Sequence, residues 1–169
     1  MTNKKEISSI LNNSKTLFDI FNFHVDNSPN KNIFFSKNKN DWHSQSFLKT
    51  YENIEKIKYF FLKNNLKKGD RVFLLSSNRI EWVEFDLAIM SLGGVTVPSF
   101  VTNNVADNHF IIKDCEPKFI ILENESVFEK NKSFLNNIKK NILLIEQSDS
   151  FINYKKILLN SKKQTKKIN

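Results

Sequence analysis

The fold of this chain is decided by the stretch Gly69-Asp70-Arg71-Val72-Phe73-Leu74-Leu75-Ser76-Ser77-Asn78, which runs on through Glu81-Trp82 to Leu87-Ala88-Ile89-Met90-Ser91-Leu92-Gly93-Gly94-Val95-Thr96-Val97-Pro98. Four successive apolar residues at 72–75 are typical of a strand buried on both faces. The apolar run at 82–92 predicts a buried helix, which the two glycines end. Residues 95–97 return as a strand that Pro98 ends, so the unit predicts parallel strands joined by a right-handed crossover.

Two helices begin with a capping signal. Asn78 can accept a hydrogen bond from a free backbone N–H of the first turn, and Glu81, three residues later, can reach back to it. Ser126 and Glu129 have the same spacing. We therefore predict a capping box at the start of each helix.

The alternation of strands and helices continues along the chain. We expect a helix at 104–114 with Val105, Phe110 and Ile111 on its inner side, a strand at 119–122, a helix at 126–137, a strand at 142–145 and a helix at 151–159. Strands alternating with helices predict an α/β fold, with a mostly parallel sheet flanked by helices.

A different pattern precedes this region. Thr16 is placed to cap a helix that carries Leu17, Ile20, Phe21 and Val25, which share one face. Two short strands, 33–35 and 42–45, are expected around a turn at 37–40. A longer helix, 46–64, has a buried stripe made of Tyr51, Ile54, Ile57 and Phe61. We predict a flexible N-terminus at 1–14, one domain at 15–160 and a basic tail at 161–169.

Composition limits the classes of partner. The chain has 169 residues and a net charge of +8, so a nucleic-acid or membrane partner has to be considered. The lysines are scattered except in the tail, which favours a solvated surface over a nucleic-acid site. No stretch approaches the ~20 apolar residues of a membrane span, and no signal peptide is visible. The single cysteine, Cys115, excludes an internal disulfide and fits a cytoplasmic protein.

Residues that commonly carry chemistry are sparse. The three glycines, Gly69, Gly93 and Gly94, form no phosphate-binding pattern, and we expect turn and packing roles for them. The three histidines, His24, His43 and His109, have no paired spacing for zinc and are expected to be solvated or to lie on helix surfaces. We expect Cys115 to be a half-buried, unreactive thiol.

The charged residues are read as structural. Glu84 with Asp86, and Glu123 with Glu125, are spaced two apart, which does not put them on one helical face, so we expect ordinary surface charges. At the strand entrance we expect Asp70 to order the turn and Arg71 to find an acidic partner. The sequence therefore assigns no catalytic, cofactor-binding or metal-binding residue.

The order of these motifs from about Thr16 to Glu123 resembles the N-terminal part of AMP-forming acyl-CoA synthetases, the adenylate-forming ligases. The resemblance rests on the Gly-Asp-Arg-Val strand at 69–72, the Asn-x-x-Glu-Trp helix start at 78–82, Leu-Ala-Ile at 87–89 and the strand at 93–98. The segment 100–103 and the stretch 114–121 are similar to the long-chain fatty-acid branch. Asn65 stands where that family often has glycine, and Val101 where many members have proline.

This resemblance implies ATP-dependent activation of a fatty acid and its transfer to CoA, with ATP, Mg²⁺ and CoA as cofactors of the family. The phosphate loop with its lysine, the adenine-contacting motifs and the catalytic lysine of that family have no counterpart among these 169 residues. We therefore expect a truncated or split long-chain acyl-CoA synthetase that does not catalyse the reaction alone. The alternative is a non-catalytic interaction protein, which pairs with a complementary C-terminal ligase fragment or with itself. Nucleic-acid binding through the lysine tail is the third and weakest hypothesis.

Overall fold

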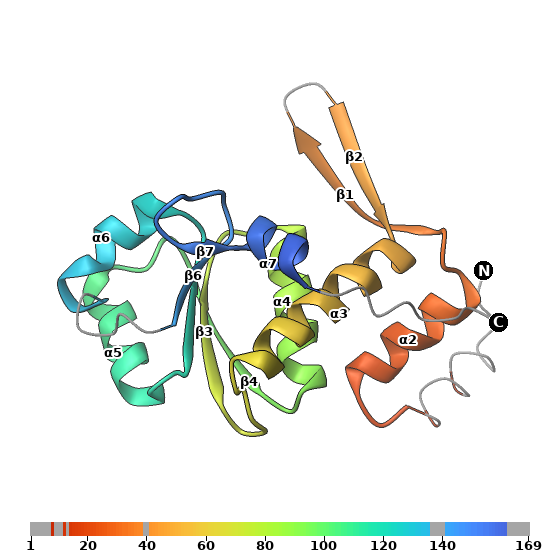
Figure 1. The fold of residues 1–169 in the computed structure, drawn as a ribbon, viewed down its shortest axis with the longest axis horizontal. Coiled ribbons are helices and arrows are strands. Elements are labelled where there is room, and N and C mark those ends of the chain that lie inside the picture. The colour runs from red at the N-terminus through yellow and green to blue at the C-terminus, as the bar shows by residue number, and fades with distance from the viewer. Residues whose placement is uncertain (1–7, 9–11, 13, 39–40, 136–140, 162–169) are drawn as a thin grey trace.

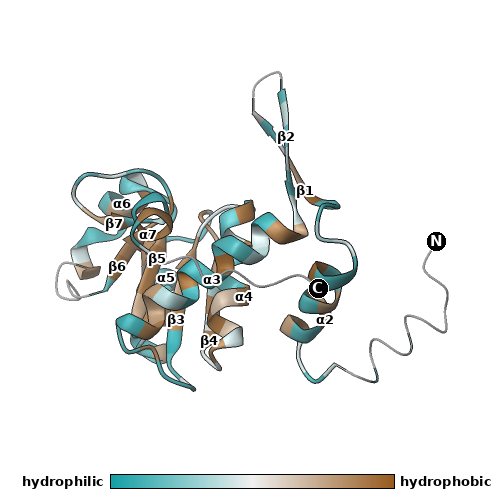
Figure 2. Cartoon of the chain, turned by 45° about the vertical axis from the view of Figure 1, so that its right-hand side comes forward, coloured by the Kyte–Doolittle hydropathy of each residue, from teal (hydrophilic) through white to brown (hydrophobic). Residues whose placement is uncertain are grey.

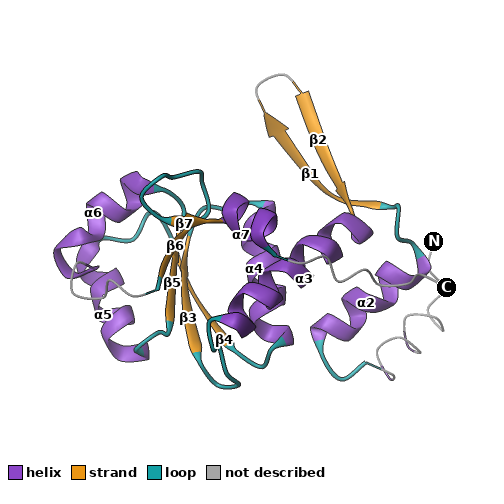
Figure 3. Ribbon diagram, viewed as in Figure 1, coloured by secondary structure: helices purple, strands orange, loops and turns teal. Residues whose placement is uncertain are grey.

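The computed structural model describes residues 8, 12, 14–38, 41–135 and 141–161. Five strands form one parallel sheet in the order β4-β3-β5-β6-β7. Their bounds are β3 Arg71–Leu75, β4 Val95–Ser99, β5 Phe119–Leu122, β6 Ile142–Leu144 and β7 Ile152–Asn153. The sheet is drawn edge-on in Figure 3, with helices on both sides. The prediction of an α/β fold with a parallel sheet flanked by helices is confirmed.

Helices cover the two faces of the sheet in separate groups (Figure 1). On one face lie α3 Phe47–Lys63, α4 Ile80–Ser91 and α7 Tyr154–Asn160, and on the other α5 Val105–Cys115 and α6 Glu125–Leu135. Val72 and Leu74 point to the first face and Phe73 and Leu75 to the second, because successive side chains of a strand alternate. The strands are mostly hydrophobic in Figure 2. Two apolar cores result, and they sandwich the sheet.

The first part of the chain stands outside this sandwich. Helix α2 Leu17–Asn27 packs against α3 and α4, and the predicted Thr16 cap is confirmed by a full capping box with Asp19. Strands β1 Asn32–Asn38 and β2 Asp41–Ser46 form an antiparallel hairpin. The hairpin projects from the start of α3 (Figure 1). The predicted strand pair and the predicted long helix are both confirmed.

Neither predicted capping box forms, although both helices begin close to the predicted residue. Helix α4 begins after Arg79, whose side chain makes no cap, and the Glu81 carboxylate binds the Arg79 guanidinium instead of reaching back to a backbone N–H. Helix α6 begins one residue before Ser126, and the Asn124 side chain accepts from the Val127 N–H at 3.0 Å. At α4 the Arg79 guanidinium binds the Glu81 carboxylate that was expected to reach back to the backbone. At α6 the Asn124 side chain, not Ser126, caps the helix.

Three further differences have local causes. Val105 and Ile111 pack against the core on this face, as predicted, but Phe110 is 71% exposed, and the buried residues of α5 are Asn108 and Ile112. Strand β4 continues through Pro98, because an edge strand tolerates a residue without an N–H. The last predicted helix begins at Tyr154, since residues 152–153 pair with β6 as a short fifth strand.

The predicted end of the helix at 137, part of the 37–40 turn, and nearly all of the flexible N-terminus and basic tail lie outside the described residues.

Candidate functional site at the topological switch point

The strand order creates one position where ligands of doubly wound folds usually bind. From β3 the chain moves to β4 on one side, and β5 then lies on the other side of β3. The crevice beyond the carboxyl ends of β3 and β5 is therefore a topological switch point, where the two crossovers diverge. The segment 76–79 follows β3 and Glu123 follows β5, so these residues form the candidate site.

The crevice is closed by a carboxylate of the chain itself. The Ser77 backbone N–H donates to Glu123 Oε2 at 2.7 Å, and the Ser77 hydroxyl donates to Glu123 Oε1 at 2.8 Å. These are the kinds of donors that an incoming phosphate would use. Because Glu123 already accepts from both, the strand ends are tied together and the anion position is filled from within. The prediction that Glu123 is an ordinary surface charge is wrong.

Arg79, the single guanidinium at this site among the described residues, is surrounded by carboxylates. Its nitrogens lie 3.0 Å from Glu81, 3.1 Å from Glu146 and 3.8 Å from Glu123. Partial burial alone would lower its pKa, but the hydrogen bonds and charges of Glu81 and Glu146 outweigh burial and raise it. The positive charge is therefore neutralised within the protein and does not form an anion-binding site.

A hollow of about 470 Å³ lies between the hairpin and this end of the sheet. The hairpin contributes Ser36, His43 and Gln45, while the loop after β3, the start of α4 and Tyr154 line the opposite side. Most of the residues that line the hollow are polar, and it is open to solvent. Its shape depends on how the base of the hairpin is held against the helices.

That attachment is made by a buried carboxylate. Glu84 is 0% exposed, which makes the prediction of a surface charge wrong; its partner in that prediction, Asp86, is half-buried. Gln45 and Asn53 donate their amide N–H groups to Glu84 Oε1 at 2.7 and 2.9 Å, and the Tyr154 hydroxyl donates to Oε2. Burial raises the pKa of Glu84 to about 7, although these three hydrogen bonds oppose the shift. Burial and the Glu84 charge also raise the pKa of Tyr154.

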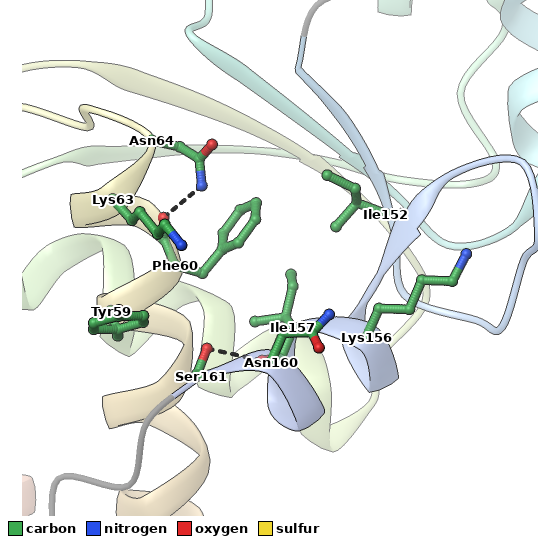
Figure 4. Close-up of a pocket in the computed structure, with 9 residues that line it drawn as sticks. All are labelled: Tyr59, Phe60, Lys63, Asn64, Ile152, Lys156, Ile157, Asn160 and Ser161. Carbon is green, nitrogen blue, oxygen red and sulfur yellow. Dashed lines mark hydrogen bonds between the residues drawn. The ribbon is translucent and has the colours of Figure 1, made fainter.

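A second hollow, of about 350 Å³, lies between the end of α3 and the β7–α7 segment (Figure 4). Its floor is apolar, formed by Phe60, Ile152 and Ile157. Lys156 is not free to bind an anion there, because its ammonium donates to the carbonyl groups of Ser148, Asp149 and Phe151. The hollow therefore offers mainly apolar surface, with Lys63 as the other lysine that lines it.

The glycines have the turn and packing roles that the sequence predicts. Gly69 and Gly93 have φ angles of +85° and +75°, which side chains rarely adopt. A Cβ on Gly94 would lie 2.9 Å from Ile89 Cγ2, so this glycine allows α4 and β4 to pack closely. Gly69 and Gly93 therefore allow turns, and Gly94 allows close packing, as the sequence predicts.

The histidines and the cysteine also lie apart from one another. His24 stacks on Phe47 and His109 stacks on Phe134, while His43 is exposed on the hairpin. Cys115 is half-buried, and burial raises the pKa of its thiol. A raised thiol pKa disfavours the reactive thiolate, which agrees with an unreactive role.

Of the charged pair at the start of β3, Asp70 has the predicted role and Arg71 does not. Asp70 orders the turn by accepting from the Lys67 N–H at 2.8 Å, which lowers its pKa, and it pairs with Lys118. Arg71 has no acidic partner among the described residues. It donates instead to the backbone carbonyls of Cys115 and Glu116 and so holds the end of α5 against β3.

Sequence reasoning missed the two carboxylates that organise the site. Glu84 stands inside an apolar run, between Val83 and Phe85, which was the available signal that its side chain faces the core. Glu123 comes directly after a fully buried strand, where polar residues gather at a switch point. Neither signal depends on a motif.

Two absences hold for the described part of the chain. No group of three or more His, Cys, Asp or Glu side chains is arranged to hold a metal ion there. No helix in residues 14–38, 41–135 or 141–161 is long and apolar enough to cross a bilayer.

The fold and its switch point define a doubly wound α/β architecture, and comparison with known proteins identifies the family. Residues 21–167 match the family model described as "AMP-binding enzyme". Because the match covers most of the chain, the protein belongs to the AMP-binding enzyme family. The resemblance to adenylate-forming ligases is thus confirmed.

Similar proteins of known name are ligases. The chain is 30% identical over 95 residues to the long-chain-fatty-acid–CoA ligase ACSBG2 of Xenopus laevis, an alignment covering 56% of this chain and 13% of the relative. It is 34% identical over 61 residues to the long-chain-fatty-acid–CoA ligase FadD15 of Mycobacterium tuberculosis, covering 36% and 10%. The chain thus spans a small fraction of the length of these relatives.

Solved structures agree on the fold. The anthranilate CoA ligase AuaEII, in complex with anthranoyl-AMP, superimposes with a TM-score of 0.77 at 17% identity, covering 90% of this chain and 29% of that one. The fatty acyl-adenylate ligase of L. pneumophila superimposes with a TM-score of 0.69 at 16% identity, covering 98% and 27%. At these identities the likeness establishes architecture alone.

Proposed function

We propose that this chain forms the N-terminal part of the adenylation fold of a long-chain acyl-CoA ligase. In the reaction of such a ligase, a fatty-acid carboxylate attacks the α-phosphorus of ATP and releases pyrophosphate. The CoA thiol then attacks the acyl-adenylate carbonyl carbon and releases AMP. The observation that carries the proposal is the family match over residues 21–167, supported by curated relatives that are named long-chain-fatty-acid–CoA ligases.

The described residues do not fit ATP. At the switch point the donors of Ser77 are taken by Glu123, and Arg79 is balanced by carboxylates. A triphosphate placed there would compete with three fixed negative side chains, which opposes binding. We therefore propose that these 169 residues contribute scaffold and that the nucleotide, Mg²⁺ and CoA are held by other parts of the ligase fold.

A pyrophosphate-release assay tests this proposal. The purified chain is incubated with ATP, Mg²⁺, CoA and a long-chain fatty acid, with a complete ligase such as FadD15 as the positive control. We expect no release above the rate without enzyme, and no saturable ATP binding by calorimetry. Turnover that scales with the concentration of the chain would contradict a scaffold role.

A second candidate function is that of a non-catalytic interaction protein. It is favoured by large apolar side chains that remain exposed: Trp42 at 68%, Phe100 at 68% and Leu159 at 73%. Contact with another polypeptide would remove such side chains from water, which is favourable. We propose that the remaining part of a ligase fold or a second copy of the chain covers it. Sedimentation of the pure chain over a hundredfold range of concentration separates self-association from a monomer that requires a different partner.

A further inference from the structure

Glu84 joins three segments that are distant in the sequence. Gln45 lies at the base of the hairpin, Asn53 on α3 and Tyr154 at the start of α7, and each donates to the same carboxylate on α4. Gln45 also donates to the Thr50 hydroxyl at 2.8 Å. The Gln45 side chain therefore ties the base of the hairpin to α3 through Thr50 and to α4 through the Glu84 carboxylate.

The network has one acceptor too many. Asn53 is 2% exposed, and its side-chain oxygen has no hydrogen-bond donor in the part of the chain that the structure describes. Its nitrogen meanwhile donates both to Glu84 and to the Tyr154 oxygen, the latter at 3.1 Å. A buried acceptor without a donor is costly, so the network is one hydrogen short of satisfaction. The nitrogen of Asn53, not this oxygen, bonds the Glu84 carboxylate, so a proton on Glu84 would not pair the oxygen unless the amide turned over.

The charged and polar groups around Glu84 come from several elements. Glu81, on the same helix, disfavours a second negative charge. His43 and Arg79 line the adjacent hollow from the hairpin and the β3–α4 loop, and α7 contributes Tyr154. Helix α3 presents the non-titrating Thr50 and Asn53, while α2, which also packs against α4, contributes apolar side chains to the shared core.

We propose that Glu84 is a proton-operated latch for the β1–β2 hairpin. With Glu84 ionised, its Oε1 holds the base of the hairpin through Gln45. When Oε1 binds a proton it becomes a donor, and the amide N–H groups of Gln45 and Asn53 lose a charged acceptor. Gln45 is then left with a neutral acid in place of a carboxylate, and a hydrogen bond to a neutral acceptor is weaker.

The latch acts on the hollow at the switch point. Gln45 and Tyr154 are both linked to Glu84 and both line that hollow. Loosening the Gln45 contact weakens one of the bonds that hold the base of the hairpin, which carries Ser36 and His43 on the opposite wall. The opening between hairpin and strand ends is therefore linked to pH near neutrality.

Hydrogen exchange combined with carboxyl NMR tests the latch in the full chain. The ¹³C shift of the Glu84 carboxyl gives its titration, and amide exchange at residues 43–46, corrected for intrinsic rates, reports the base of the hairpin between pH 5.5 and 8.5. We expect exchange there to become about fivefold to tenfold faster as Glu84 binds a proton, the change that follows from replacing a charged acceptor by a neutral one. The amides of β3 should not follow this transition.

Two variants make the test specific. Glu84→Gln carries a permanently neutral group and should show the fast exchange at every pH, whereas Asp86→Asn, two residues along α4, should keep the wild-type transition. A wild-type Glu84 that titrates near its ordinary value, or that titrates near 7 while exchange at 43–46 stays constant, would overturn the proposal. These two outcomes are read from the wild-type protein and do not depend on the folding of a variant.

Discussion

Ser77 and Glu123 close the switch point of this sheet from within, because the backbone N–H and the hydroxyl of Ser77 bind opposite oxygens of the Glu123 carboxylate at 2.7 and 2.8 Å. The contact joins residues that follow neighbouring strands, 46 positions apart in the sequence. The place where related architectures commonly hold a phosphate is used here to hold the molecule together.

The first prediction concerns this contact. Glu123→Gln should lower the free energy of unfolding by about 1.5–3 kcal/mol, because it weakens the charge-assisted bonds to Ser77 and removes a charge beside Arg79. Glu129→Gln is the matched control, since Glu129 is exposed and its ion-pair partner among the described residues is Lys132, and its effect should stay within ~0.5 kcal/mol. Urea denaturation measures both; equal effects would show that the contact contributes nothing special.

The second prediction concerns pH. The pKa of Glu84 is about 7 in the folded protein and 4.5 as a reference. Between these values the folded state binds a proton that the unfolded state lacks, so this stabilisation is present below pH 4.5 and lost as pH rises through 7. The contribution is roughly 3 kcal/mol. The difference in unfolding free energy between wild type and Glu84→Gln should therefore change by about that amount from pH 4.5 to 8; a constant difference would rule it out.

This global effect and the proposed latch have opposite signs but separate readouts. A proton on Glu84 relieves the cost of a buried charge and so stabilises the whole fold. The same proton weakens one local hydrogen bond at the base of the hairpin. Equilibrium denaturation reports the first effect, and amide exchange at residues 43–46 reports the second.

The third prediction concerns Asn65, which has a φ angle of +61° in the turn after α3. Asparagine tolerates this left-handed conformation better than most residues, and glycine adopts it without strain. Asn65→Gly should leave stability unchanged or raise it by a few tenths of a kcal/mol, whereas Asn65→Val should lower it by about 1–2 kcal/mol. Thermal unfolding of the two variants checks the order, and a Val variant as stable as the Gly variant would contradict it.

The fourth prediction concerns the orientation of α5. Ile112 is 3% exposed and Phe110 is 71% exposed. Ile112→Ala should therefore cost about 2–4 kcal/mol, because it leaves a cavity against the sheet, whereas Phe110→Ala should change stability by less than ~0.5 kcal/mol. Denaturant titration of the two variants tests the assignment. A large loss for Phe110→Ala would mean that the helix is rotated from the position described.

The strands and the order of elements could be predicted from the sequence because runs such as Val72–Leu75 and Phe119–Leu122 have the composition of doubly buried strands. The two-residue strand β7 could not, since so short a segment has no pattern and is extended only because it pairs with β6. The face of α5 was misassigned at Phe110 because size and hydrophobicity do not decide which side of a short helix meets the core.

The site was harder to predict than the fold. The spacing of residues around Glu84 and Glu123 indicates no role for either side chain. Their roles arise from hydrogen-bond partners 31 to 70 positions away in the chain. Such contacts depend on tertiary packing, which a motif cannot express. The family could be recognised from ordered motifs, because those motifs record turns and strand ends that depend on local sequence.

The two edge strands of the sheet, β4 and β7, affect how readily another copy of the protein can pair with it. Pro98 interrupts the row of amide donors along β4, and β7 at the opposite rim is two residues long. A long, regular edge is the usual template for runaway strand pairing between molecules, and these two rims lack that regularity. The sheet is thus protected against amyloid-like stacking by its own outermost strands.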